Sequence, residues 1–343
     1  MYKMYKMILK QPVTIQDAIE SCAKDVKKAV NIMMNRRVYL TGCGSSFHAA
    51  IYGEFVLRKF GFDVHAVQAL DMIHYTPKLN NSTVIVISHS WKTRTTLKAV
   101  DVINHNEIPC IGITANERAK KDVDVLLRTS TYYDESDCVT MGYTTQLAAL
   151  AQIAEHNTAN KQIQNVPLLL KNVLNTENKI RELATKYSKH RRFFVLGAGP
   201  NTATAFEMAL KMKEGNFTDT EGVQMEQMLH GSISGIDEED VVFLIAPKDA
   251  KTRHRVYDTA KALGKIGVST IVVTDDATEI TKECKHAIKI GYSPEYLNPI
   301  VSILPLQLFA YFIAEKNGIN PDQTREEDLK YRKAYGTLFL HFK

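Results

Sequence analysis

Two short β-branched runs end in glycine turns 155 positions apart, and this feature most restricts how the chain can fold. Residues 37–42 (RVYLTG) end at Gly42, and residues 192–197 (RFFVLG) end at Gly197. The apolar runs that follow keep a similar spacing, because 157 positions separate Val84 from Val241. A nearly constant offset through successive runs predicts an internal duplication.

Apolar runs alternate with helical patterns in both halves of the chain. The expected strands are 37–42, 83–88, 110–114, 123–128, 192–197, 241–246, 269–274 and 286–291. The expected helices are 16–34, 47–60, 203–214 and 300–316. Because each apolar run is continuous, as in strands covered on both faces, the sequence predicts an α/β fold of parallel sheets wrapped by helices.

The length of 343 residues suggests two domains, at roughly 150 residues per domain. We expect an N-terminal helical segment over 1–35 and a first domain over 36–160. A linker helix and a second domain are expected over 161–320, followed by a charged tail over 321–343. The stretch 148–189 is polar and helix-forming, and we interpret it as the connection.

Several classes of protein are disfavoured by composition. The net charge of +5 is scattered, without the basic stripe of a nucleic-acid binder. The five cysteines form no C-x-x-C pair, which argues against a disulfide scaffold and a structural zinc site. No signal peptide is apparent, and the apolar run 300–313 contains Pro305 and Gln307 and is shorter than a membrane span. We expect a cytoplasmic protein without metal, cofactor or membrane contact.

Hydroxyl side chains follow two expected strands, and open parallel sheets bind ligands beyond the carboxyl ends of their strands. The first turn (42–48, GCGSSFH) carries Ser45 and Ser46 before a helix. Phe47 replaces the third glycine of a dinucleotide-binding G-x-G-x-x-G, which argues against that ligand. The second turn (88–96, SHSWKTRTT) adds Lys92 and Arg94. Alone it fits a phosphate nest or a helix cap with solvated cations equally well, but two such turns together favour phosphate.

These motifs, taken in order, resemble those of the sugar isomerase (SIS) domain family, and most of all the isomerase half of the glucosamine-6-phosphate synthases. Residues 42–46 and 88–93 resemble its C-G-T-S and S-Q-S-G-E-T signatures. Residues 209–214 (ALKMKE), 229–231 (LHG), 303–311 (ILPLQLFAY) and 322–325 (DQTR) resemble later segments in the same order. The likeness covers roughly residues 30 to 330.

The resemblance implies two flavodoxin-like SIS domains, each a parallel sheet with helices on both faces, that bind a hexose 6-phosphate or an amino-sugar phosphate. The implied phosphate ligands are Ser46, Ser88, Ser90 and Thr93 with the His89 and Ser90 amides, and Ser45 contacts a sugar hydroxyl. The family also implies a homodimer whose partner subunit donates a histidine to the site.

Four further residues receive catalytic roles from the resemblance. Glu214 would move a proton between C1 and C2 of the sugar, with Lys211 beside it. His230 would assist opening and closing of the sugar ring. The C-terminal tail would complete the active site, and Lys330 is nearest in spacing to the family's Schiff-base lysine, with Lys333 as its competitor.

The residue types agree with that chemistry, although each has a plainer interpretation. Aldose–ketose interconversion needs a carboxylate near an acidic C–H and a second group that relays protons. Glu207, Lys211 and Glu214 share one face of a helix, where a surface ion-pair ladder is the alternative. His230 taken alone fits a core or capping histidine, and Lys330 fits a solvated lysine.

Departures from the family pattern limit the transfer of function. The short stretch before the first strand leaves no room for a glutaminase domain, so we expect the chain to need free ammonia or a separate partner. Trp91 and Lys92 stand where the family usually has glycine and glutamate.

Three functions follow. The first is an enzyme that isomerises and deaminates an amino-sugar phosphate, converting glucosamine 6-phosphate to or from fructose 6-phosphate plus ammonia. The second is a fructosamine 6-phosphate deglycase, in which Trp91, Lys92 and Arg94 accommodate an amino-acid portion. The third is a non-catalytic sugar-phosphate sensor, which the presence of both Glu214 and His230 disfavours.

Overall fold

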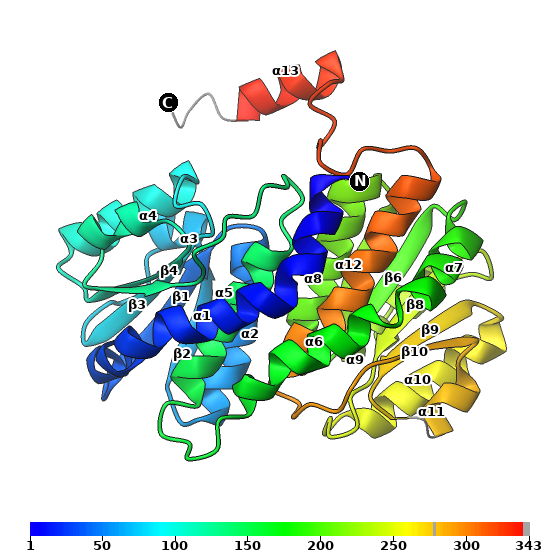
Figure 1. The fold of residues 1–343 in the computed structure, drawn as a ribbon, viewed down its shortest axis with the longest axis horizontal. Helices are drawn as coiled ribbons and strands as arrows, with labels where there is room; N and C mark the ends of the chain where they lie inside the picture. Colours follow the sequence, from blue (N-terminus) through cyan, green and yellow to red (C-terminus); the bar gives the residue numbers. More distant parts are fainter. Residues whose placement is uncertain (277–278, 339–343) are drawn as a thin grey trace.

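The computed structural model describes residues 1–276 and 279–338, which form two five-stranded sheets with helices around them (Figure 1). The first half contains α1 (Lys3–Met33), β1 (Arg37–Gly42), α2 (Ser45–Lys59), β2 (Val64–Gln68), α3 (Ala69–His74), β3 (Ser82–Ile87), α4 (Arg94–His105), β4 (Cys110–Thr114), η1 (Glu117–Lys121), β5 (Val125–Arg128) and α5 (Met141–Ala154). Then follow η2 (Gln162–Asn165), α6 (Val166–Leu174) and α7 (Glu177–Tyr187). The second half contains β6 (Arg192–Gly197), α8 (Asn201–Asn216), β7 (Asp219–Gln224), α9 (Met225–Leu229), η3 (Ser232–Gly235), β8 (Val241–Ile245), α10 (Arg253–Ile266), β9 (Ser269–Thr274), α11 (Glu279–Glu283), β10 (His286–Lys289), α12 (Asn298–Lys316) and α13 (Leu329–Leu338).

The two sheets are parallel and have equivalent strand orders. The first is β2-β1-β3-β4-β5, and the second, counted from the matching edge, is β7-β6-β8-β9-β10. Val38 of β1 lies opposite Thr83 of β3, as Phe193 of β6 lies opposite Val241 of β8. The predicted α/β fold is thus confirmed, and the repeated order agrees with a duplication. The predicted domain boundaries stay a prediction.

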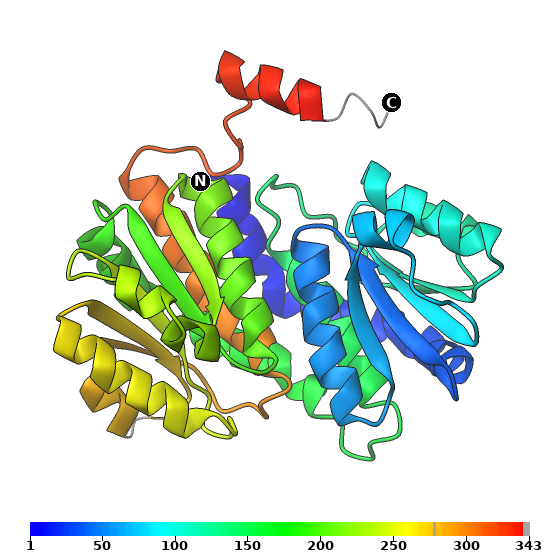
Figure 2. The ribbon, with the colours of Figure 1, turned by 180° about the vertical axis from the view of Figure 1, so that it is seen from behind.

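Both sheets face one central layer of helices. Alternate strand residues, such as Leu40 and Ile85 in the first sheet and Val195 and Phe243 in the second, belong to a single apolar cluster with α1, α2, α5, α6, α7, α8 and α12. On the outer faces, α3 and α4 cover the first sheet, and α9, α10 and α11 cover the second (Figures 1 and 2). The two halves therefore share a core rather than packing as separate bodies.

Helix α12 runs through the middle of this layer (Figure 1). Within the described residues it is the one helix long and apolar enough to span a membrane, and 94% of its most apolar window is buried inside the protein. Such burial is typical of a core helix, so the length and composition of α12 are only weak evidence for a membrane span.

Four elements differ from the sequence predictions. The edge strands β2 and β7 were not predicted, because their partly exposed faces give a mixed polar pattern. Helix α1 begins at Lys3 instead of residue 16 and continues through Pro12, because burial of Met4 and Ile8 in the shared core offsets the hydrogen bond that proline cannot donate. Residues 148–154 are not part of a polar connection, since every residue of α5 is buried.

The C-terminal tail crosses one end of the molecule and carries α13, which stands clear of the body and has no buried residue (Figure 2). Asp322 anchors the start of the tail, because its carboxylate accepts the N–H groups of Lys3 (2.5 Å) and Met4 (2.7 Å) and the hydroxyl of Ser136 (2.9 Å). The last five residues of the predicted tail lie outside the described residues.

Candidate active site

A cavity of about 430 Å³ lies at the carboxyl ends of β1 and β3 in the first sheet. Helix α2 leads from β1 to β2 on one side, whereas α4 leads from β3 to β4 on the other, so these strands form the switch point where open sheets bind ligands. The volume suits a small metabolite. Its lining residues are Cys43, Gly44, Ser45, Ser46, Ser88, His89, Ser90, Thr93, Tyr133, Asp134, Glu135, Ser136, Asp137, Val139, Gln146, Lys211 and Glu214.

All six residues predicted to bind substrate line this cavity. The hydroxyl of Ser46 accepts the Gln146 side-chain N–H at 3.1 Å, and the hydroxyl of Ser88 accepts the Trp91 backbone N–H at 3.1 Å. Helix α2 begins beside the first turn and α4 beside the second, so two helix N-termini add the partial positive charge that favours an anion. The arrangement fits a phosphate group.

Two predicted catalytic residues come from the second half, through α8. Lys211 is fully buried, and its ammonium lies 2.6 Å from a carboxylate oxygen of Glu214 and 3.5 Å from one of Glu207. Burial alone would lower the pKa of Lys211, but the Cys138 sulfur and both carboxylates raise it above its ordinary value. The ammonium therefore keeps its charge and holds the Glu214 carboxylate, whose side chain is 29% exposed, at the cavity wall.

Glu207 links the two halves beneath the cavity. Its carboxylate accepts the hydroxyl of Ser45 at 2.9 Å and contacts His48 Nδ1 at 2.8 Å. Burial would raise the pKa of Glu207, yet Lys211, His48 and Ser45 together hold it below the ordinary value. A fully buried, charged glutamate thus connects Ser45 to the lysine that holds Glu214.

Residues of the loop 129–140 also line the cavity, and Tyr133 of this loop packs against His89 of the second serine turn. Asp134 organises this loop, because its carboxylate accepts the backbone N–H groups of Ser136, Thr140 and Gly142. The Asp134 backbone N–H in turn donates to His89 Nε2 at 3.1 Å, which requires a neutral ring, and burial lowers the pKa of His89 accordingly. The His89 side chain therefore anchors the loop.

Trp91 is turned away from the cavity. Its side chain is 5% exposed in the outer cluster beneath α4, and its indole N–H donates to Asp122 at 3.0 Å. The expectation that Trp91 accommodates part of a substrate is therefore wrong, since the ring fills the core. Lys92 is exposed and, like Arg94, does not line the cavity.

The structure does not bring His230 or Lys330 to the cavity. His230 follows α9, has a side chain that is 70% exposed and contacts Glu226 of α9 at 3.2 Å. Lys330 lies in the first turn of α13, where its backbone N–H donates to Asp328 at 2.9 Å. Lys333 is likewise exposed on α13. The predicted roles of these residues stay predictions.

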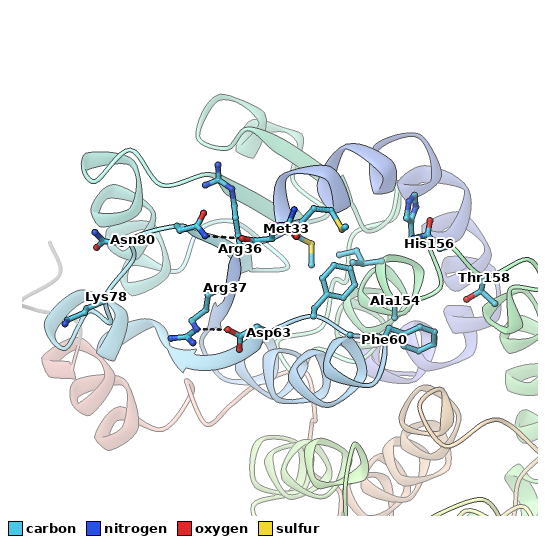
Figure 3. A pocket seen from close by; sticks show the side chains of 17 residues that line it. Met33, Arg36, Arg37, Phe60, Asp63, Lys78, Asn80, Ala154, His156 and Thr158 are labelled. Carbon is cyan, nitrogen blue, oxygen red and sulfur yellow. Dashed lines mark hydrogen bonds and ion pairs between the residues drawn. The ribbon is translucent and has the colours of Figure 1, made fainter.

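A larger hollow of about 870 Å³ lies at the opposite, amino-terminal end of the first sheet (Figure 3). Arg36, the Arg37–Asp63 ion pair and Lys78 line it on one side, and Phe60 lies on the other. It contains none of the predicted site residues. Because helix N-termini and the strand-end turns lie at the other end of the sheet, we place the candidate site in the smaller cavity.

Three residues of the site carry chemistry that sequence reasoning left unused or underweighted. Glu207 was placed with Lys211 and Glu214 on one helix face but received no role, because its burial depends on contacts between the two halves. His48 is the last residue of the first turn (42–48), but nothing in the local sequence indicates its contact with Glu207. Gln146 lies 100 positions after Ser46 in the sequence, and its side chain bonds that serine in the fold.

The SIS domain family model matches residues 32–156 and 186–314. The glutamine–fructose-6-phosphate aminotransferase of Pyrococcus horikoshii is 31% identical over 337 residues, which cover 94% of this chain and 56% of that protein. The corresponding protein of Aquifex aeolicus is 29% identical over 334 residues, again 94% and 56%. This chain therefore spans about half the length of these curated relatives, and the matched half is their SIS portion.

Solved structures show the same fold. The C-terminal domain of glucosamine-fructose-6-phosphate aminotransferase from Francisella tularensis matches with a TM-score of 0.84 and 22% identity, covering 94% of this chain and 98% of that one. Tagatose-6-phosphate ketose/aldose isomerase from Escherichia coli gives 0.81 and 22%, covering 93% and 94%. Glucosamine-6-phosphate deaminase from Thermotoga maritima gives 0.74 and 20%, covering 94% and 97%.

Proposed function

Because the chain belongs to the SIS domain family, we propose that it acts on an amino-sugar phosphate by isomerisation and deamination. The reaction interconverts glucosamine 6-phosphate with fructose 6-phosphate and ammonia. Its relatives by sequence and fold are named for fructose 6-phosphate, tagatose 6-phosphate and glucosamine 6-phosphate chemistry. Those names support the substrate class, and the chain's own residues support the reaction.

The observation that carries this proposal is the position of Glu214. Its carboxylate lines the same cavity as Ser45, Ser46 and Ser88, although it comes from the other half of the chain. A pure phosphate-binding module has no use for a carboxylate at that place, because a carboxylate repels the phosphate anion. A base that takes a proton from the sugar carbon needs one.

The proposed steps use these residues. The serine turns and the N-termini of α2 and α4 hold the phosphate, and Ser45 holds a sugar hydroxyl. Glu214 removes the proton from C2 of the open-chain aldose and returns it to C1, while a second proton passes from the nitrogen to the carbonyl oxygen O1, which leaves a hydroxyl group at C1 and an imine at C2. Addition of water to that imine releases ammonia and gives the ketose. Lys211 keeps the Glu214 carboxylate oriented.

Two groups remain to be delivered to the cavity. We propose that the chain forms a homodimer, in which the exposed His230 of a second copy reaches the ring oxygen. Lys330, or Lys333, approaches from α13 when the tail closes over the substrate. Both proposals rest on the family resemblance and on the exposure of these side chains.

A coupled assay tests the function directly. Purified protein is incubated with glucosamine 6-phosphate, with fructose 6-phosphate plus ammonium, and with fructosamine 6-phosphates, while ammonia and amino-acid release are measured. We expect ammonia release from glucosamine 6-phosphate, and Glu214→Gln should lower turnover at least about 10²-fold, in line with the usual contribution of a general base. Full turnover by Glu214→Gln would refute its assignment.

The same assay separates the alternatives. Release of an amino acid from a fructosamine 6-phosphate, without ammonia from glucosamine 6-phosphate, would identify a deglycase. Binding without turnover would identify a sensor. Lys213→Met is the matched control, because Lys213 is exposed on the same helix α8 and its loss should leave turnover unchanged.

A further inference from the structure

Two acidic side chains face the substrate cavity without a partner. Glu135 and Asp137 are exposed on the loop 129–140 and line the same cavity as the serine turns. Among the described residues, neither carboxylate forms a hydrogen bond or an ion pair. The neighbouring Asp134 differs from them, because backbone N–H groups satisfy its buried carboxylate.

A buried acceptor in the same cavity is also unsatisfied. Gln146 is 1% exposed and donates its side-chain N–H to Ser46, while its Oε1 has no hydrogen-bond partner among the described residues. An unsatisfied buried polar atom costs free energy unless a ligand or water completes it. Lys211, the one lysine among the described residues that line the cavity, is already paired with Glu214 and Glu207. Two carboxylates and one amide oxygen of the cavity therefore lack a donor among the described residues.

The cavity thus combines two kinds of group. Its serine hydroxyls and the N-termini of α2 and α4 suit an anion. Glu135 and Asp137 suit a cation. A hexose phosphate without an amino group would use the first set only. A ligand that carries both a phosphate and an ammonium group would use both.

We propose that Glu135 and Asp137 determine specificity by binding the protonated amine of an amino-sugar phosphate. This inference rests on the proposed function and adds the residues that distinguish amino sugars from their hydroxyl counterparts. A hydroxyl can also donate to a carboxylate, but an ammonium donates a charge-assisted bond of roughly twice the strength. Specificity of this kind is a difference between two affinities, and it is measured as one.

The test uses two unreactive ligands that differ in one group. Glucitol 6-phosphate and 2-amino-2-deoxyglucitol 6-phosphate both lack the carbonyl, so neither can react. Their dissociation constants are measured by calorimetry at about pH 6.5, where free carboxylates are ionised. We expect the wild type to bind the amino ligand about tenfold more tightly, a ratio that corresponds to one charge-assisted contact.

The decisive variant is Glu135→Gln with Asp137→Asn. It should lower the preference for the amino ligand over glucitol 6-phosphate to less than about threefold. The affinity for glucitol 6-phosphate itself should change little, because the serine turns are unaltered. The control is Asp71→Asn with Asp101→Asn, which removes the same charge from two exposed residues of the first half that do not line the cavity. The control should keep the full preference.

Other outcomes overturn the inference in distinguishable ways. A wild type that binds both ligands equally, or a double variant that keeps the preference, refutes the role of Glu135 and Asp137 and leaves the sugar-phosphate function standing. An equal loss of both affinities in the double variant also refutes it, since the acids would then organise the loop. Failure of the wild type to bind either ligand refutes the proposed function together with the inference.

Discussion

Lys211→Met tests the electrostatic cluster beneath the cavity. The substitution keeps most of the side-chain volume and removes the ammonium that lies 2.6 Å from Glu214 and 3.5 Å from Glu207. At an effective dielectric constant of about 20, these distances correspond to attractions of roughly 6 and 5 kcal/mol. Desolvation of the buried ions opposes much of that attraction in the wild type.

The variant leaves Glu207 buried without its cation. Removing one partner of a buried ion pair typically costs about 3–5 kcal/mol, and we expect a loss of that size in the free energy of unfolding. The sign of the pH dependence follows from Glu207. In the wild type its lowered pKa contributes stability at neutral pH that is lost as the pH falls. In the variant the charged form is disfavoured, so the difference between the two proteins shrinks as the pH falls and Glu207 becomes protonated.

Urea unfolding followed by circular dichroism at about pH 8 and pH 5 measures this difference, with Lys213→Met as the control. The control should stay within about 0.5 kcal/mol of the wild type, as is usual for an exposed residue. A loss below about 1 kcal/mol for Lys211→Met, equal at both pH values, would show that the cluster is solvated and that the reasoning is wrong.

Two further predictions concern the strand-end turns. Gly197→Ala should destabilise the protein by about 3 kcal/mol or more, because the added Cβ would lie 2.0 Å from the Asn201 carbonyl oxygen. The control Gly264→Ala, where the Cβ meets no atom within 4 Å, should be neutral or stabilising. Equal thermal midpoints for the two variants would contradict the steric argument. Ser88→Ala with Thr93→Val should weaken binding of fructose 6-phosphate about tenfold or more, since each lost hydrogen bond to a charged group is worth about 1.5–3 kcal/mol. Calorimetry measures that affinity, and unchanged binding by the folded variant would show that this turn does not bind the phosphate.

Sequence patterns predicted the inner strands well, because their apolar runs are short, continuous and punctuated by glycine. They missed two of the four edge strands, β2 and β7, although β5 and β10 were predicted. Residues 64–68 and 219–224 form strands β2 and β7, yet each has one partly exposed side and a mixed polarity. The start of α1 was missed for a different reason, since Pro12 is a local stop signal that tertiary burial overrides.

Some residues of the candidate site could be predicted from the sequence and others could not. Residues that follow strands, such as Ser46 and Ser88, were predictable because the topology of a parallel sheet places strand ends together. The role of Glu207 was not predictable, because its partners Ser45 and His48 come from the other half of the chain. The prediction that Trp91 accommodates part of a substrate failed because the position of a residue in a turn does not determine the direction of its side chain. Its backbone φ of 54° directs the ring into the core.

Because one chain supplies both sheets that cover the helical layer, the two halves stay associated even when the protein concentration is low. A unit with one sheet and the same helices would leave that layer exposed unless a second copy covered it, and such pairing weakens as the copies become dilute. Here both sheets belong to one chain, so the second contacts the layer at an effective concentration set by the linker and not by the cell. The joined halves stay together on dilution, and only contacts to further copies depend on how much protein is made.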